Sequence, residues 1–170
     1  MMDRRQFTGR LAGAFIGATI AKAPFVPRWS SRARRLTLDA ARLNAHLKAL
    51  SAFGANPQGG VSRVAYSEFD KAGRAHVMDL MRGAGLDVGI DFAGNIVGRR
   101  RGSDAALKPI VFGSHIDSVP EGGNFDGTVG SLSAVEVAHT LGEQRIVTRH
   151  PIEVVVWANE EGGLYGSRAV

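Results

Sequence analysis

Histidine and acidic side chains gather at the ends of two apolar runs in this sequence. The first run leads into "GSHIDSVPEGGNFDGTVG", residues 113–130, and the second is "PIEVVVWANEEGG", residues 151–163. His115 and Asp117 flank a single residue, so in an extended chain both side chains point to the same side. A carboxylate so placed can orient a metal-binding imidazole or approach the same ion. The spacing therefore indicates metal chemistry.

Three more carboxylates complete the group: Asp126 in the glycine-rich loop, and Glu160 with Glu161 after the second run. The chain has no cysteine, so nitrogen and oxygen atoms must hold any metal, which suits Zn²⁺, Mn²⁺ or Co²⁺. A glutamate beside such ions can take a proton from water as a general base. If the second strand continues through the two glutamates, they point in opposite directions and have different roles. Each motif alone is common in turns, and the joint spacing is what favours a metallohydrolase.

Periodicity and turn residues predict the elements that must position these groups. Apolar residues at helical spacing predict a first helix between Leu36 and Leu50, and Ser67 with Asp70 predicts a capping box that opens a second helix. The remaining predicted elements are a hairpin over 86–100, a strand over 109–115, a helix over 127–144 and a strand over 151–161.

This order of elements predicts an α/β fold, a mixed sheet with helices on both faces. In such sheets functional groups gather beyond the carboxyl ends of the strands, which is where both acidic segments lie. If the chain is part of a larger domain, we expect the sheet edge beside the last strand to lack a partner. Uncovered apolar helix faces would then make the isolated chain aggregate.

Residues 1–23 have the pattern of a twin-arginine-type signal peptide. Arg4 and Arg5 precede an apolar stretch, and Ala21-Lys22-Ala23 has the form of a cleavage site. We expect a linker over 24–35, the hydrolase domain over 36–170, and a bacterial protein that is periplasmic or secreted. No stable membrane span is expected after cleavage, because the apolar stretch is too short. An amphipathic helix that belongs to the domain is the alternative.

The basic charge of the chain belongs to this leader. Residues 1–35 hold eight of the 21 basic residues and one of the 16 acidic residues, which leaves 13 basic and 15 acidic residues in the body. A mildly acidic body argues against a nucleic-acid partner. The run "RRRG" at 99–102 is expected to be a solvated turn.

Four ordered motifs resemble one family. These are "FGANPQGGVSRVAYSEFD", "AGLDVGIDFAGNIVGRR", "GSHIDSVPEGGNFDGTVG" and "PIEVVVWANEEG". They resemble the hydantoinase/carbamoylase branch of the M20 metallopeptidase-like amidohydrolases, which includes N-carbamoyl-L-amino-acid hydrolases, allantoate amidohydrolases and β-ureidopropionases. The resemblance implies a di-metal hydrolase catalytic domain that cleaves the carbamoyl (ureido) C–N bond of a small-molecule ureido substrate. It implies two divalent ions, with Zn²⁺ expected first and Mn²⁺, Co²⁺ or Ni²⁺ as alternatives.

The resemblance also implies a role for each residue of the group. His115 would bind one metal ion, Asp126 would bridge both ions, and Glu161 would bind the other. Glu160 would be the general base, and Asp117 would be the partner that orients His115. In this picture the two ions polarise the scissile carbonyl and acidify a shared water, and Glu160 moves its proton to the leaving nitrogen.

Members of this family are longer than 170 residues and form homodimers. We therefore expect a lid or dimerisation domain, two more histidine ligands and the residues that bind the substrate carboxylate beyond Val170. The other histidines of the chain are expected at the surface or in packing rather than as ligands; they are His46, His76, His139 and His150.

Three interpretations remain open on the sequence alone. The chain is the N-terminal part of an exported ureido hydrolase, an M20-type aminopeptidase or aminoacylase with the same metal motifs, or an exported metal-binding fragment without turnover. "FDG" and "GGVSR" favour the carbamoylase branch.

Overall fold

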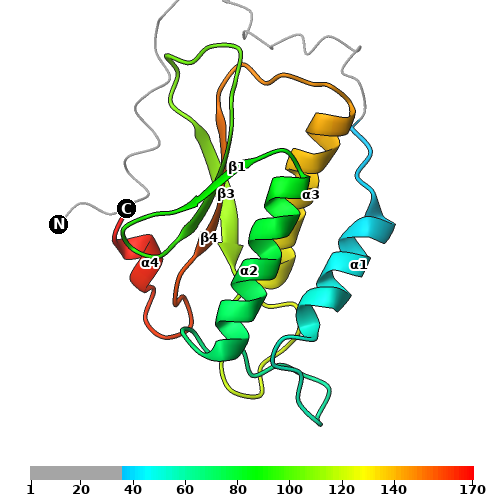
Figure 1. Ribbon diagram of the computed structural model, residues 1–170, viewed down its shortest axis with the longest axis vertical. Coiled ribbons are helices and arrows are strands. Elements are labelled where there is room, and N and C mark those ends of the chain that lie inside the picture. Colours follow the sequence, from blue (N-terminus) through cyan, green and yellow to red (C-terminus); the bar gives the residue numbers. More distant parts are fainter. Residues whose placement is uncertain (1–35) are drawn as a thin grey trace, which may run out of the picture. The chain divides into compact units, whose positions relative to one another are not determined.

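A computed structural model describes residues 36–170 of the chain (Figure 1). The predicted order of helices, hairpin, strand, helix and strand is confirmed, and a short final helix was not predicted. The signal peptide predicted at 1–23 and the linker predicted at 24–35 lie outside the described residues. The elements are α1 Ala40–Ser51, α2 Glu68–Gly83, β1 Asp87–Ile90, β2 Ile96–Arg100, β3 Ile110–His115, α3 Thr128–Glu143, β4 Ile152–Trp157 and α4 Tyr165–Arg168.

The four strands form one mixed sheet in the order β1-β2-β4-β3. β2 pairs antiparallel with both β1 and β4, whereas β3 and β4 are parallel, with His115 opposite Trp157. The last strand is therefore inside the sheet, and the prediction of a free edge beside it is wrong. The near-continuous burial of β4, from Ile152 to Val156, explains the central position, because such a strand needs neighbours on both sides.

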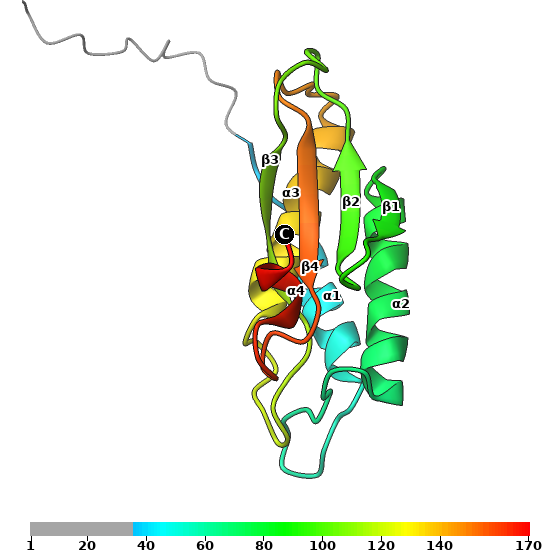
Figure 2. The same ribbon diagram turned by 90° about the vertical axis from the view of Figure 1, so that its left-hand side faces the viewer.

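The three long helices cover one face of the sheet, and the single turn of α4 lies on the other (Figures 1 and 2). The predicted helices on both faces are thus present, but the two layers are very unequal. Ile152, Val154 and Val156 of β4 pack into the core with Leu132 and Val135 of α3. In the described range, no helix combines the length and apolarity needed to span a bilayer.

The predicted cap of α2 forms with one change in its partners. The Ser67 side chain accepts a hydrogen bond from the N–H of Asp70 (3.2 Å), as expected for an N-cap. In a capping box the acidic side chain reaches back to the N–H of the cap residue itself. Here the Asp70 carboxylate accepts from Tyr66 N–H instead (2.9 Å), one residue earlier, where the chain turns with a φ of 66°.

A buried ion pair fastens α1 to α3. Arg42 donates from Nε and Nη2 to the two oxygens of Glu136, each at 2.8 Å, and the Glu136 side chain has no exposed surface. The N–H of Asp39 and the hydroxyl of Thr140 donate to the same carboxylate. The hydrogen bonds from Arg42, which outweigh burial, hold the pKa of Glu136 down at about 2, against 4.5 for an ordinary glutamate.

This ion pair predicts a specific loss of stability in acid. A carboxylate with a depressed pKa stabilises the folded state above its unfolded pKa, and this contribution disappears as pH falls from about 4.5 to about 2. We expect Glu136→Gln to lower the free energy of unfolding at pH 7 by roughly 3 kcal/mol and to flatten its dependence on pH in this window. Urea unfolding at a series of pH values measures both effects.

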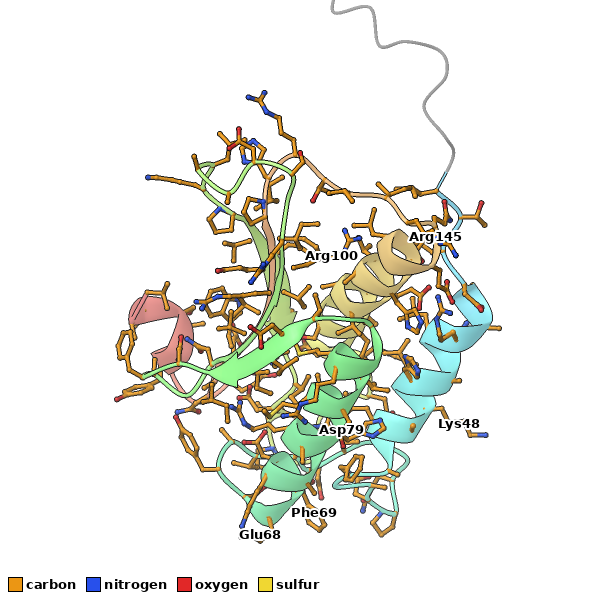
Figure 3. All side chains as sticks on the ribbon, turned by 45° about the horizontal axis from the view of Figure 1, so that its top comes forward. Lys48, Glu68, Phe69, Asp79, Arg100 and Arg145 are labelled. Carbon is orange, nitrogen blue, oxygen red and sulfur yellow. The ribbon has the colours of Figure 1, made fainter. Side chains whose placement is uncertain are left out.

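Glu68→Gln is the matched control, since Glu68 lies on the surface of α2 with 89% of its side chain exposed (Figure 3). Because it removes no buried contact, it should leave the free energy of unfolding at pH 7 nearly unchanged. An identical acid profile for wild-type protein and Glu136→Gln would contradict the assignment.

Candidate metal centre

The parallel pairing of β3 and β4 brings both acidic segments to the same end of the sheet, beyond the carboxyl ends of these two strands; this end is called the carboxyl edge of the sheet. His115 is the last residue of β3 and is only 7% exposed. Its Nε2 atom lies 3.6 Å from Glu160 Oε2 and 3.9 Å from Asp126 Oδ1. One ligand atom each from His115, Glu160 and Glu161 lie within 4.8 Å of one another. This group has the nitrogen and oxygen donors that Zn²⁺ and similar divalent ions accept.

Asp117 connects the imidazole to the turn that carries the glutamates. His115 Nδ1 lies 3.0 Å from the main-chain oxygen of Asp117 and 3.6 Å from its Oδ1. The Asp117 carboxylate accepts the N–H groups of Glu160 (3.3 Å) and Glu161 (3.1 Å). When Nδ1 donates its proton to Asp117, Nε2 keeps the lone pair that a metal ion needs. The main-chain oxygen of Asp117 is thus placed to set the tautomer of His115, and the Asp117 carboxylate fixes the position of the turn.

The pKa shifts at this edge reflect burial and the close contacts among the acidic groups and His115. Burial, followed by the nearby Asp126 carboxylate, raises the pKa of Glu161. Burial by itself would lower the pKa of His115, but its contacts with the side chain and main chain of Asp117 outweigh it and raise that pKa. Burial would raise the pKa of Asp117, but hydrogen bonds with His115 and the two glutamate N–H groups lower it. Since clustered carboxylates repel one another, a divalent cation would stabilise the group, and the donor set fits one.

Gly127 provides the space for the imidazole. It is the N-cap of α3 with a φ of 61°, and a Cβ there would collide with the His115 ring. Glycine is therefore required both by the backbone conformation and by the close approach. The preceding residue, Asp126, has a side chain that is 75% exposed.

The five residues singled out in the sequence lie at one edge, in an arrangement that differs from the prediction in two details. Asp126 is near His115 but outside the group of ligand atoms that converge within 4.8 Å, whereas Glu160 is inside it. β4 ends at Trp157, and the chain turns at Asn159 with a φ of 52°. The predicted strand over 151–161 therefore ends four residues early, and the condition under which the two glutamates would point in opposite directions is not met.

Sequence reasoning missed two buried residues that support the site. Arg63 is 1% exposed and donates to three main-chain oxygens, those of Ile116 (2.6 Å), Leu50 (2.9 Å) and Phe53 (2.8 Å). It thus holds the peptide between His115 and Asp117. The second residue, Asn95, was interpreted only as part of the hairpin turn. Arg63 belongs to the "GGVSR" motif and Asn95 to "AGN", and both motifs lie in the segments that resemble the family. No hydrophobic periodicity in the sequence indicates that either of these side chains is buried.

The other histidines lie away from this edge. His46, His76 and His139 are half-buried, one on each of α1, α2 and α3, and His150 precedes β4 at the opposite end of that strand. Within residues 36–170, none of the four belongs to a group of converging metal-ligand atoms.

Comparisons with known proteins relate the sequence and fold of this chain to metallopeptidase-like hydrolases and amidohydrolases. The model of Peptidase family M28 matches residues 95–170. The N-carbamoyl-L-amino-acid amidohydrolase of Pseudomonas sp. (strain NS671) is 40% identical over 142 residues, which are 81% of this chain and 34% of that protein. The corresponding protein of Geobacillus stearothermophilus is 43% identical over 134 residues, 76% of this chain and 33% of that protein. A further relative, the allantoate amidohydrolase of Escherichia coli, is 37% identical over 116 residues, 68% of this chain and 28% of that protein.

Solved structures show the same relationship. The crystal structure of a hydantoinase/carbamoylase family amidase from Burkholderia ambifaria is 45% identical and superposes with a TM-score of 0.74, over 76% of this chain and 32% of that one. The chain thus spans about a third of the length of the relatives it matches. At this similarity in sequence and fold, the chain belongs to the hydantoinase/carbamoylase family of amidohydrolases.

Proposed function

We propose that the intact protein containing this chain hydrolyses the carbamoyl (ureido) C–N bond of N-carbamoyl amino acids or allantoate-like compounds, with the help of divalent metal ions. The convergence of His115, Glu160 and Glu161 at the carboxyl edge of β3 and β4 carries this proposal. The names of the relatives support the ureido substrate class and give no support to an aminopeptidase or aminoacylase.

In this proposal two ions occupy the site, with Zn²⁺ as the first candidate. His115 would hold one ion through Nε2, Glu161 would hold the other, and the exposed Asp126 carboxylate would contribute further oxygen ligands. The ions supply the Lewis acidity that polarises the carbonyl and makes water more acidic. Asp117 accepts the Nδ1 proton of His115 and keeps Nε2 directed at the site.

Glu160 moves the proton in this mechanism. Its Oε2 atom faces the site 3.6 Å from His115 Nε2, so it can reach a water held between the two segments. Water adds to the carbonyl carbon of the ureido group, and Glu160 takes the proton that the water loses. The C–N bond then breaks, and Glu160 returns that proton to the leaving nitrogen.

Ammonia release from N-carbamoyl amino acids and from allantoate tests the proposal. We expect activity that is lost after chelation and restored by Zn²⁺, Mn²⁺ or Co²⁺. Hydrolysis of N-acyl amino acids or dipeptides, without cleavage of ureido compounds, would instead establish the aminoacylase or aminopeptidase class. Metal binding without turnover of either substrate class would establish a non-catalytic metal-binding protein.

Export and dimer formation stay predictions from the sequence. The intact mass of the native protein from the cell envelope tests cleavage after Ala23, and its mass in solution tests the homodimer.

A further inference from the structure

One buried side chain holds both ends of the turn that carries Glu160 and Glu161. Asn95 has no exposed surface. Its Oδ1 accepts the N–H of Ala158 (2.9 Å), just before the turn, and its Nδ2 donates to the main-chain oxygen of Gly166 (3.1 Å), just after it. The two ends also bond directly, from Gly166 N–H to Ala158 O at 2.9 Å.

Asn95 is itself fixed by the hairpin turn. Asp91 accepts the second Nδ2 proton of Asn95 through Oδ2 (2.9 Å) and its main-chain N–H through Oδ1 (2.8 Å). Both amide protons and the amide oxygen are therefore engaged. The fit around this amide is close, since a Cβ on Gly166 would collide with Asn95 Oδ1.

Only an amide of this size satisfies all three partners. Aspartate in its place would set a carboxylate against Asp91 and against the Gly166 carbonyl oxygen. Alanine would leave the buried N–H of Ala158 without an acceptor, which costs about 1–3 kcal/mol for such a group. The amide chemistry is thus matched to three groups: the Asp91 carboxylate of the hairpin, the N–H of Ala158 directly after β4, and the main-chain oxygen of Gly166 in α4.

We propose that Asn95 is a positioning residue, which holds the 158–166 turn so that the Glu160 and Glu161 carboxylates both face His115. It touches neither carboxylate and acts through Ala158 and Gly166. Asp117 restrains the same turn from the β3 side, through the N–H groups of the two glutamates. What the glutamates bind rests on the function proposed above, whereas their placement by Asn95 does not.

Asn95→Ala and Asn95→Asp in the intact protein test this role with two readouts. In the metal-free protein, hydrogen exchange of the 158–166 amides should become faster while that of α3 is unchanged. Calorimetric titration with Zn²⁺ should show affinity weakened by about 10-fold, the effect usual for residues that orient ligands. Asn95→Asp keeps the side-chain volume but adds a buried carboxylate, so Asn95→Ser, which removes the amide without adding a charge, takes the place of the alanine variant if that variant does not fold.

Leu141→Ala is the control for a loss of stability alone. Leu141 lies in the core at the end of α3 far from Gly127. Its replacement by alanine should lower the melting temperature without changing Zn²⁺ affinity. Unchanged exchange of the turn in both Asn95 variants, or Zn²⁺ affinity equal to wild type, would overturn the proposal. If the wild-type protein binds none of Zn²⁺, Mn²⁺ and Co²⁺, the proposed function fails, and the exchange measurement alone decides the role of Asn95.

Discussion

Glu160→Gln is expected to lower kcat by about 10²–10⁴-fold, the usual contribution of a general base, while metal binding persists. The glutamine keeps the shape of the side chain but cannot take a proton from water. Glu160 and Glu161 both present an oxygen to the same group, so the position of the atoms does not distinguish base from ligand. Kinetics with N-carbamoyl amino acids, paired with Zn²⁺ titration, separates the two roles.

Glu161→Gln is the matched partner of this experiment. It makes the same chemical change one residue along, and we expect it to weaken Zn²⁺ binding, with loss of activity as the consequence. If Glu160→Gln loses metal as strongly as Glu161→Gln, Glu160 is a ligand and the base must be sought elsewhere.

Asp117→Ala is expected to weaken Zn²⁺ affinity by 10-fold to about 100-fold, the range seen when the partner of a ligating histidine is removed. Two effects combine in this variant. The His115 ring loses the carboxylate beside Nδ1, and the N–H groups of Glu160 and Glu161 lose their acceptor. Asp117→Asn should have a smaller effect, because one side-chain oxygen can still accept one of these N–H groups.

Asp79→Asn is the control for the loss of one negative charge. Asp79 lies on the outer surface of α2, where it pairs with Arg82 (Figure 3), and its replacement should leave Zn²⁺ affinity unchanged. Calorimetry on the three variants gives the comparison. Wild-type affinity in Asp117→Ala would show that the turn and the imidazole are held without this carboxylate.

The sequence was sufficient for the parts of the site that depend on local pattern. The apolar runs before His115 and before the "NEEG" motif predicted two buried strands, with both acidic segments at the carboxyl ends of these strands. The parallel pairing of β3 and β4 then brings His115, Asp117 and the two glutamates to one edge. The glycine before α3 was visible as a helix start, although its contact with the imidazole was not.

Long-range contacts account for what the sequence did not reveal. β4 was expected to continue to Glu161, because no breaker precedes Gly162. The turn forms earlier because Asn95, 63 residues away, binds the N–H of Ala158, and because asparagine at 159 tolerates a positive φ. The burial of Arg63 likewise depends on carbonyl groups from α1 and from the segment after β3.

The register of β4 against β3 has a further consequence for the metal site. A shift of β4 against β3 by one residue would move the glutamates about 3.3 Å in the direction of the strand. It would also turn the apolar side chains of β4 to the wrong face of the sheet. Metal–ligand distances tolerate deviations of only about 0.2 Å. The packing of Ile152, Val154 and Val156 against α3 therefore determines how far the proposed ligands after β4 lie from His115 at the end of β3.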